Sequence, residues 1–382
     1  MNDSSQTLPV AVVPWGEPGA PHGSQPRPPS QEERERATAL LEAGGVLAIP
    51  TETVYGLAVR GDQAQALARL RAIKSRETAQ ALTWHIGSHD ALKLLGSVSP
   101  MVWRLAQRYW PGPLTLVVPG VPRGLEAAAQ DGWIGVRLPA HTTSADWIAH
   151  LPFPLVATSA NRRGKAELAD AASIAREFAG EVELVLDGGP PRLAEPSLVL
   201  RVGPGKFEVL RPGLLDLNRL RETAGLRIVF VCTGNTCRSP MAAALAQHAL
   251  AKRLQVPARR VGDFGFEIFS AGLAANFGAP IAQNALEVLT ELTPELGRSA
   301  REHRAQAAIP EEIGRADRVY ALTSGHLDVM RSMLPPGRAK HTELLDPDGG
   351  DVPDPIGSNL AEYRRCRDQL AELIERRLDE WA

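Results

Sequence analysis

Two cysteines stand five residues apart beside an arginine in the stretch RIVFVCTGNTCRSPMAAAL, residues 227–245. Cys232 ends an apolar run typical of a buried strand, and an apolar helical pattern begins at Arg238. A thiol at a helix N-terminus, among backbone N–H groups and beside a guanidinium, is stabilised as the thiolate. The pattern therefore predicts that Cys232 is a nucleophile and that Arg238 binds two oxygens of a phosphoryl group.

The loop from 232 to 239, called the phosphate loop below, has residue types that suit this chemistry. Gly234 permits a tight turn, Asn235 can hold the loop through its side-chain amide, and Ser239 is placed to hydrogen-bond the sulfur. Cys237 either captures an oxidised Cys232 as a reversible disulfide or is simply buried. Besides Cys232 and Arg238, the predicted phosphate-binding residues are Thr233, Gly234, Asn235, Thr236, Cys237 and Ser239.

The nonapeptide CTGNTCRSP resembles the low-molecular-weight protein-tyrosine phosphatase family, and the resemblance covers about residues 226–382. It implies a small doubly wound parallel sheet and hydrolysis through a cysteinyl-phosphate, without a cofactor. Its catalytic residues would be Cys232, Arg238 and the general acid Asp354, which stands in GDVPDPIGS. The segment SAG at 270–272 and the pair His303-Arg304 match the family as well.

The substrate depends on single positions at the mouth of this loop. Thr236 resembles the protein-arginine phosphatases of the family, whereas tyrosine-specific members generally carry a bulkier aliphatic residue there. Ile356 stands where an aromatic residue is usual. We therefore expect a phosphoprotein substrate, either phosphoarginine or phosphotyrosine. Arsenate reduction on the same scaffold would need a relay of further thiols, and Cys366 is the only other cysteine.

The first half of the chain contains a second set of polar residues near predicted strands. Thr51 and Thr53 follow a buried strand, Lys74 and Arg76 alternate along the chain, and further on come Arg137, Ser159 and Asn161. Cations and hydroxyl groups at strand ends can converge on an anionic substrate. Each signal is weak alone, because a threonine pair can also be a helix cap and lysines are often solvated.

Together, PTETVYGL, the pair Lys74 and Arg76, PGPLT, the pair Ser159 and Asn161, and LRPG resemble the YrdC-like threonylcarbamoyl-AMP synthases, over about residues 33–213. The resemblance implies that L-threonine, bicarbonate and ATP form threonylcarbamoyl-AMP and pyrophosphate, with Mg²⁺ accompanying ATP. Downstream partners would be the threonylcarbamoyl transfer machinery and tRNA. The implied site is Thr51, Thr53, His85 and Arg137 for threonine and its carbamate, Arg76, Gln80, Thr115, Asn161 and Arg211 for ATP, together with Lys74, Ser159 and Ser197.

This half departs from the family pattern at a few positions. Glu77 and Ala81 stand where prolines are usual, and Leu198 replaces a hydroxyl residue. The alternative is a module that binds nucleotide or RNA without catalysis, so that the phosphatase is the only enzyme.

Composition and segment patterns set the organisation of the chain. Its 382 residues, 44% hydrophobic and 23% charged, are those of a globular protein with two α/β domains. A net charge of −2 gives no general attraction to nucleic acid, and three cysteines suit the cytoplasm. No apolar run is long enough for a membrane helix. The predicted parts are a disordered Pro/Gly-rich tail at 1–30, a YrdC-like domain at 31–213 with a twisted sheet, a linker at 214–225 and the phosphatase domain at 226–382.

Overall fold

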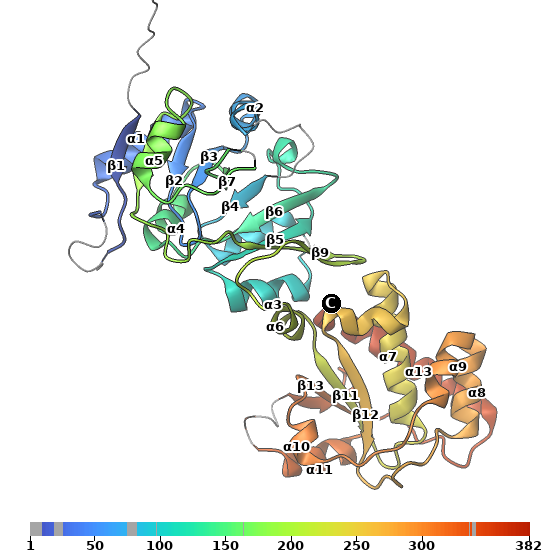
Figure 1. Ribbon diagram of the computed structural model, residues 1–382. Helices are drawn as coiled ribbons and strands as arrows, with labels where there is room; N and C mark the ends of the chain where they lie inside the picture. Colours follow the sequence, from blue (N-terminus) through green and yellow to red (C-terminus); the bar gives the residue numbers. More distant parts are fainter. Residues whose placement is uncertain are drawn as a thin grey trace, which may run out of the picture. The chain divides into compact units, whose positions relative to one another are not determined.

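The computed structural model describes residues 10–18, 26–74, 82–96, 98–162, 164–335, 337 and 341–382. The chain forms two compact units, residues 1–216 and 217–382, and each is described by itself (Figure 1). Both are α/β structures, as predicted. Within the described residues no helix is long and apolar enough to cross a membrane.

The first unit is built on a mixed sheet of ten strands. Its order is β1-β8-β2-β3-β7-β4-β6-β5-β9-β10, with parallel and antiparallel neighbours. In chain order the strands are β1 (Ala11–Pro14), β2 (Leu47–Ile49), β3 (Gly56–Arg60), β4 (Thr83–His85), β5 (Leu114–Pro119), β6 (Trp133–Arg137), β7 (Leu155–Ser159), β8 (Leu184–Asp187), β9 (Leu198–Gly203) and β10 (Lys206–Arg211).

Helices cover this sheet and bury their apolar sides against it. Helix α1 begins with a capping box, in which Ser30 accepts the backbone N–H of Glu33 and the Glu33 carboxylate accepts that of Ser30. Its buried residues, Ala37 and Leu41, join the core. The α-helices of the unit are α1 (Gln31–Glu42), α2 (Ala64–Ile73), α3 (Pro100–Tyr109), α4 (Thr142–Ala149) and α5 (Ala171–Glu177).

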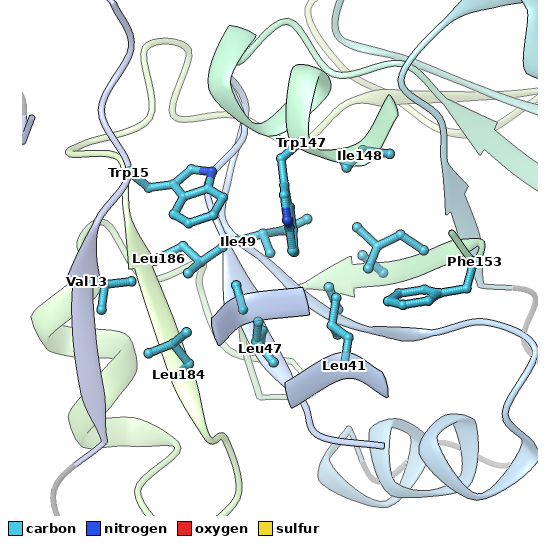
Figure 2. Packing of buried hydrophobic residues seen from close by; sticks show 14 residues of the cluster. Val13, Trp15, Leu41, Leu47, Ile49, Trp147, Ile148, Phe153, Leu184 and Leu186 are labelled. Carbon is cyan, nitrogen blue, oxygen red and sulfur yellow. The ribbon is translucent and has the colours of Figure 1, made fainter. Parts of the chain in front are cut away.

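The segment predicted as a disordered tail is partly ordered, and this corrects the sequence analysis. Strand β1 pairs in parallel with β8 at one edge of the sheet, and the N–H of Trp15 donates to the carbonyl of Asp187 at 2.6 Å. The Trp15 side chain is fully buried and meets Trp147 of α4 edge to face, with ring centroids 5.2 Å apart (Figure 2). Burial of such a large aromatic surface outweighs the low core-forming tendency of the surrounding Pro/Gly-rich sequence.

The second unit contains a four-stranded sheet in the order β12-β11-β13-β14, in which every pair is parallel. This confirms the predicted small parallel sheet. The strands are β11 (Arg227–Cys232), β12 (Glu267–Gly272), β13 (Arg318–Ala321) and β14 (Thr342–Leu344). The α-helices are α6 (Leu217–Ala224), α7 (Arg238–Leu254), α8 (Gln283–Leu292), α9 (Pro294–Arg301), α10 (Pro310–Ile313), α11 (Ser324–Met333) and α13 (Leu360–Trp381).

Helices pack on both faces of this sheet (Figure 1), which is why the central strand β11 is apolar and buried after Arg227. On one face Val229 and Val231 pack with Ile313 of α10 and Met330 of α11. On the other face Phe230, Tyr320 and Trp381 form an aromatic cluster at the end of α13. The central strand β11 therefore ends at Cys232 in a rigid setting.

Most of the segment predicted as a linker is helical. Helix α6 occupies Leu217–Ala224 and belongs to the second unit. Leu220 and Ala224 are fully buried. The charged residues between them, which suggested a solvated connection, occupy the other sides of a short amphipathic helix.

Candidate functional sites

The phosphate loop connects the end of β11 to the start of α7. The Cys232 sulfur is buried, lies 2.9 Å from the Ser239 hydroxyl, and accepts the backbone N–H of Asn235 at 3.3 Å. Cys237 is the residue before the first turn of α7, so the loop wraps around the N-terminus of a long helix. The sulfur therefore lies at the N-terminal end of the α7 helix dipole, where an anion can bind. The structure thus places Cys232, Cys237 and Ser239 together at this loop, and their predicted roles stay predictions.

Asn235 holds the loop in shape. It is fully buried and has a φ of +53°, in the left-handed region that asparagine tolerates better than most residues. Its amide nitrogen donates to the hydroxyls of Ser239 and Ser270, each at 2.8 Å. Its amide oxygen accepts the backbone N–H of Gln306 at 2.9 Å, and its carbonyl accepts from Nε2 of His303 at 2.8 Å. The loop is therefore fixed before any ligand binds.

Arg238 is held by the loop of residues 351–356, called the acid loop below. One guanidinium nitrogen donates to the carbonyl of Val352 at 3.1 Å, and another lies 2.5 Å from a carboxylate oxygen of Asp354. The Arg238 side chain is 5% exposed and that of Asp354 is 38% exposed. The structure therefore brings together the three residues predicted to be catalytic, Cys232, Arg238 and Asp354.

Two residues were expected to set substrate preference, one in the phosphate loop and one in the acid loop. Thr236 is half-buried, and its hydroxyl lies 3.7 Å from the Cys237 sulfur. Ile356 is 66% exposed, and its N–H donates to the second carboxylate oxygen of Asp354. Thr233 is exposed, and a Cβ placed on Gly234 would lie 3.6 Å from the Thr236 hydroxyl, an ordinary van der Waals contact.

Cys237 has a partner that the sequence did not reveal. Its sulfur lies 3.2 Å from the hydroxyl of Tyr363, which comes from α13 and is 126 residues away along the chain. Burial, followed by the Cys237 contact, raises the pKa of Tyr363, so its hydroxyl stays neutral. All three cysteines are free and buried, and burial raises the pKa of Cys366 to about 12.

The predicted site of the first unit surrounds a cavity of about 390 Å³ beside the sheet. Arg76 and Gln80 lie outside the described residues. Sequence reasoning missed Arg201 and Trp133, which also line the cavity and stack at 5.4 Å from guanidinium carbon to ring centroid. The predicted residues that line it are Thr51, His85, Thr115, Arg137, Ser159, Ser197 and Arg211.

A buried ion pair fixes the threonine end of the predicted site. Arg137 donates to the carboxylate of Glu52 and to the hydroxyl of Thr53, both at 2.7 Å. The Thr53 hydroxyl lies 2.9 Å from that of Thr51. The second Glu52 oxygen accepts the backbone N–H of Ala140. Arg137 is thus neutralised by Glu52, a partner that was not predicted to be a site residue.

His85 is kept neutral in this cavity. Burial lowers its pKa from 6.5 to about 3, and the positive charge of Arg137 adds to the effect. Its Nδ1 lies 3.2 Å from the carbonyl of Thr83 and must donate there, because a carbonyl oxygen has no hydrogen to give. In a neutral imidazole Nε2 is then an acceptor.

The buried side chain of Lys74 stabilises the turn that contains Ser159 and Asn161. It is 2% exposed, and its ammonium group donates to the carbonyl of Ser159 at 2.8 Å, to the side-chain oxygen of Asn161 at 2.6 Å and to the carbonyl of Asn161. The Ser159 hydroxyl donates to the same Asn161 side-chain oxygen. These contacts make Lys74 a support of the turn.

A third cluster joins the ends of β5, β9 and β10. The hydroxyls of Thr115 and Ser197 are 2.8 Å apart, and Arg211 donates to the carbonyl of Ser197 at 2.8 Å and to its hydroxyl at 3.1 Å. Within the described ranges no group of three His, Cys, Asp or Glu residues could hold a metal ion.

Comparisons with known proteins match each unit to a different family. A Sua5/YciO/YrdC family model, described as telomere recombination, matches residues 39–213. A model of the low molecular weight phosphotyrosine protein phosphatase family matches residues 227–382.

Similar proteins exist for each unit. The chain is 35% identical over 193 residues to a threonylcarbamoyl-AMP synthase of Pyrococcus abyssi, covering 50% of this chain and only 56% of that protein. A threonylcarbamoyl-AMP synthase of Chromohalobacter salexigens is 37% identical over 183 residues, which are 46% of this chain and 97% of that protein. A protein-arginine-phosphatase of Geobacillus stearothermophilus is 39% identical over 153 residues, which are 39% of this chain and 92% of that protein. A solved structure of the arginine phosphatase YwlE from the same organism is 38% identical, with a TM-score of 0.33, over 41% of this chain and 91% of that one.

The two sets of matches do not overlap along the sequence, and each falls within one structural unit. The chain is therefore a fusion of two family members, a Sua5/YrdC threonylcarbamoyl-AMP synthase domain followed by a low-molecular-weight phosphatase domain.

Proposed function

We propose that the second unit hydrolyses a phosphorylated amino acid side chain in proteins through a cysteinyl-phosphate. The observation that carries this proposal is the placement of the Cys232 sulfur within a preformed anion-binding loop, together with Arg238 and Asp354. A thiolate in this position attacks phosphorus in line with the leaving group, and Arg238 and the loop N–H groups bind the equatorial oxygens.

Proton transfer falls to Asp354. In its protonated form it donates to the departing oxygen or nitrogen as the bond to phosphorus breaks, and its carboxylate then takes a proton from the water that attacks the cysteinyl-phosphate. Inorganic phosphate leaves and Cys232 is again a thiolate. Ser239, 2.9 Å from the sulfur, stabilises that leaving thiolate by a hydrogen bond.

Phosphoarginine is the substrate we favour over phosphotyrosine. Thr236 gives the rim a short polar wall, and the protein-arginine-phosphatase of Geobacillus stearothermophilus is 39% identical over most of its length. The exposed Ile356 offers an aliphatic surface for the organic part of the substrate. The test is a direct comparison of kcat/KM for peptides that carry phosphoarginine or phosphotyrosine at the same position. A higher value for phosphotyrosine would reverse this assignment.

We also propose that the first unit is an L-threonylcarbamoyladenylate synthase. The supporting observation is a cavity lined by a neutral histidine, by Thr51, whose hydroxyl pairs with that of Thr53, and by three arginines. Nε2 of His85 can accept a hydrogen bond from the hydroxyl or amine of L-threonine, and Arg137, whose charge acts on His85, also lines the cavity. Arg211, beside Ser197 and Thr115, is suited to the phosphates of ATP.

The reaction joins threonine, bicarbonate and ATP. The carbamate formed from threonine and bicarbonate attacks the α-phosphate, and pyrophosphate departs. The cavity would hold the short-lived carbamate against the phosphate, so that the two react before the carbamate decomposes. Magnesium would be carried by the ATP phosphates and water, since the described residues offer no cage of carboxylates, and it would neutralise charge on the departing pyrophosphate.

The product would be passed to the machinery that transfers threonylcarbamoyl groups to tRNA. The test of the synthase is the appearance of label from ¹³C-bicarbonate in a nucleotide product that also contains threonine. Binding of ATP without such a product would favour the alternative, a module that binds nucleotide or RNA and leaves the phosphatase as the sole enzyme.

A further inference from the structure

His326, at the start of α11, touches the phosphate loop although no prediction assigned it to the site. Its Nε2 lies 2.9 Å from the hydroxyl of Thr233, the residue directly after the nucleophile. Its Nδ1 lies 2.9 Å from the hydroxyl of Thr323, which also accepts the backbone N–H of His326 at 3.3 Å. His326 is 7% exposed. The imidazole therefore links the rim of the loop to a helix N-terminus.

The same helix N-terminus holds the acid loop. Asp351 accepts the backbone N–H and the hydroxyl of Ser324, and the N–H of Val352 donates to the carbonyl of Leu322 at 2.8 Å. Residues 322–326 thus connect the two loops that must close around a phosphoryl group. The charged groups that face His326 are Arg238 on α7 and the carboxylates of Asp351 and Asp354 on the acid loop.

The protonation state of His326 decides what the Thr233 hydroxyl can do. In a neutral imidazole with hydrogen on Nδ1, Nε2 accepts the hydroxyl hydrogen of Thr233 and keeps it from any other partner. In the imidazolium both nitrogens donate, one to Thr323 and one to Thr233. The hydroxyl hydrogen of Thr233 is then free to turn toward a bound anion.

We propose that His326 is a positioning residue of the phosphatase site, which takes up a proton when an anion binds and thereby frees the Thr233 hydroxyl to donate to that anion. The inference rests on the proposed function, because it requires a phosphoryl group in the loop. His326 would act on the anion indirectly, through its hydrogen bond with the Thr233 hydroxyl. Thr233 directly follows Cys232 and lies at the rim of the phosphate loop.

Electrostatics supports this coupling. Burial lowers the pKa of His326, the charge of Arg238 lowers it further, and Asp354 and Asp351 act in the opposite direction. A dianion bound to Arg238 cancels the repulsion between the guanidinium and an imidazolium. Anion binding therefore favours protonation, and by reciprocity protonation favours anion binding by the same factor.

The experiment follows histidine signals by NMR during a pH titration of the full chain, with and without saturating sulfate. Sulfate is the probe because it stays a dianion across the range. The Cys232→Ser variant is used so that the thiolate does not titrate. The chain has nine histidines, and the signal missing in Cys232→Ser/His326→Gln identifies His326. We expect its midpoint to rise in sulfate, and an unchanged midpoint overturns the proposal.

Kinetics of the protein with Cys232 intact provides a second readout. His326→Gln keeps an N–H near Nε2 but cannot titrate, so competitive inhibition by sulfate should lose the part of its pH dependence that His326 supplies. His326→Ala should raise KM by roughly 3- to 10-fold, the effect of one lost hydrogen bond. His248→Gln, on α7, is the matched control and should behave as wild type. Identical KM values and pH profiles in all variants would refute the proposal.

The two hypotheses fail in different ways. If the wild-type chain hydrolyses no phosphate ester or phosphoramidate, the proposed function is wrong. If it does, and sulfate inhibits it while the His326 midpoint stays constant, only the role of His326 is wrong.

Discussion

Arg238 and Asp354 form an ion pair at 2.5 Å across the mouth of the phosphate loop. The residue that should bind the phosphoryl group is thus held by the residue that should protonate the leaving group. We expect a bound substrate to take over the guanidinium donors and so to release Asp354 toward the leaving atom. The exposed fractions suit such an exchange: the Asp354 carboxylate is 38% exposed, whereas the Arg238 side chain is 5% exposed and also donates to the Val352 carbonyl.

The decrease in rate caused by loss of the general acid should depend on the leaving group. In Asp354→Asn we expect an aryl phosphate with a good leaving group to be hydrolysed only somewhat more slowly, and one with a poor leaving group to lose roughly 10²–10⁴-fold in kcat. Steady-state kinetics on a series of aryl phosphates measures this. Asp348→Asn, an exposed carboxylate paired with Arg376, is the control and should leave the series unchanged. Equal losses across the series would remove Asp354 from this role.

Thr236 should influence the choice between phosphoarginine and phosphotyrosine. Thr236→Ile exchanges a polar rim for apolar bulk and should shift the ratio of kcat/KM toward phosphotyrosine by roughly 1–3 kcal/mol. Thr236→Ser keeps the hydroxyl and should retain the wild-type preference. The ratio is measured with matched peptides. An unmoved ratio in Thr236→Ile would assign preference to another rim residue, with Ile356 the next to examine.

Cys237 should protect the nucleophile from irreversible oxidation. Mild peroxide should inactivate the wild-type phosphatase, and a dithiol should restore it, whereas Cys237→Ser should lose recoverable activity as Cys232 passes beyond the sulfenic acid. Cys366→Ser is the matched control and should recover like wild type, since the pKa of Cys366 is raised to about 12 and its thiol is inert. Full recovery of Cys237→Ser would leave Cys237 a buried partner of Tyr363.

His85 should make the stability of the first unit depend on pH. Its pKa is 6.5 when unfolded and about 3 when folded, so below pH 6.5 the unfolded chain binds a proton that the folded chain does not. Stability is then lost as the pH falls from 6.5 toward 3, by about 1.4 kcal/mol per pH unit at most. Urea unfolding measures the free energy of unfolding at pH 7 and at pH 5. The decrease between these two values should be smaller in His85→Gln than in the wild type.

The control for this titration is a histidine of the same unit. His150→Gln removes an exposed imidazole and should keep the wild-type pH dependence. If His85→Gln loses stability between pH 7 and pH 5 as steeply as the wild type, His85 is not held neutral by the fold.

Local sequence predicted most of the phosphatase site, because its chemistry lies in one loop between a strand and a helix. CTGNTCRSP contains the proposed nucleophile, the turn residues and the arginine, which are close together in the structure because they are close together in the sequence. Asp354 required the family resemblance. Contacts between distant residues were not predictable, among them Tyr363 on Cys237 and His326 on Thr233.

The first unit shows the same limit. Arg137 was predicted to be a site residue, but its pairing with Glu52, 85 residues away, depends on the loop between β2 and β3 reaching the end of β6, a strand that is not a neighbour of either in the sheet. The strand β1 was missed because composition indicated disorder, while its stability comes from pairing with β8 and from the burial of Trp15. Helix α6 was missed because only two of its residues are buried.

The central claim is that one chain contains two independent active sites. Its most direct test is pyrophosphate release from ATP by the full chain, measured with and without threonine and bicarbonate, in wild type and in Cys232→Ser. We predict release only when both threonine and bicarbonate are present, at the same rate in both proteins, while Cys232→Ser has lost all phosphatase activity. Pyrophosphate release that does not depend on threonine and bicarbonate, or no pyrophosphate release at all, would contradict the claim.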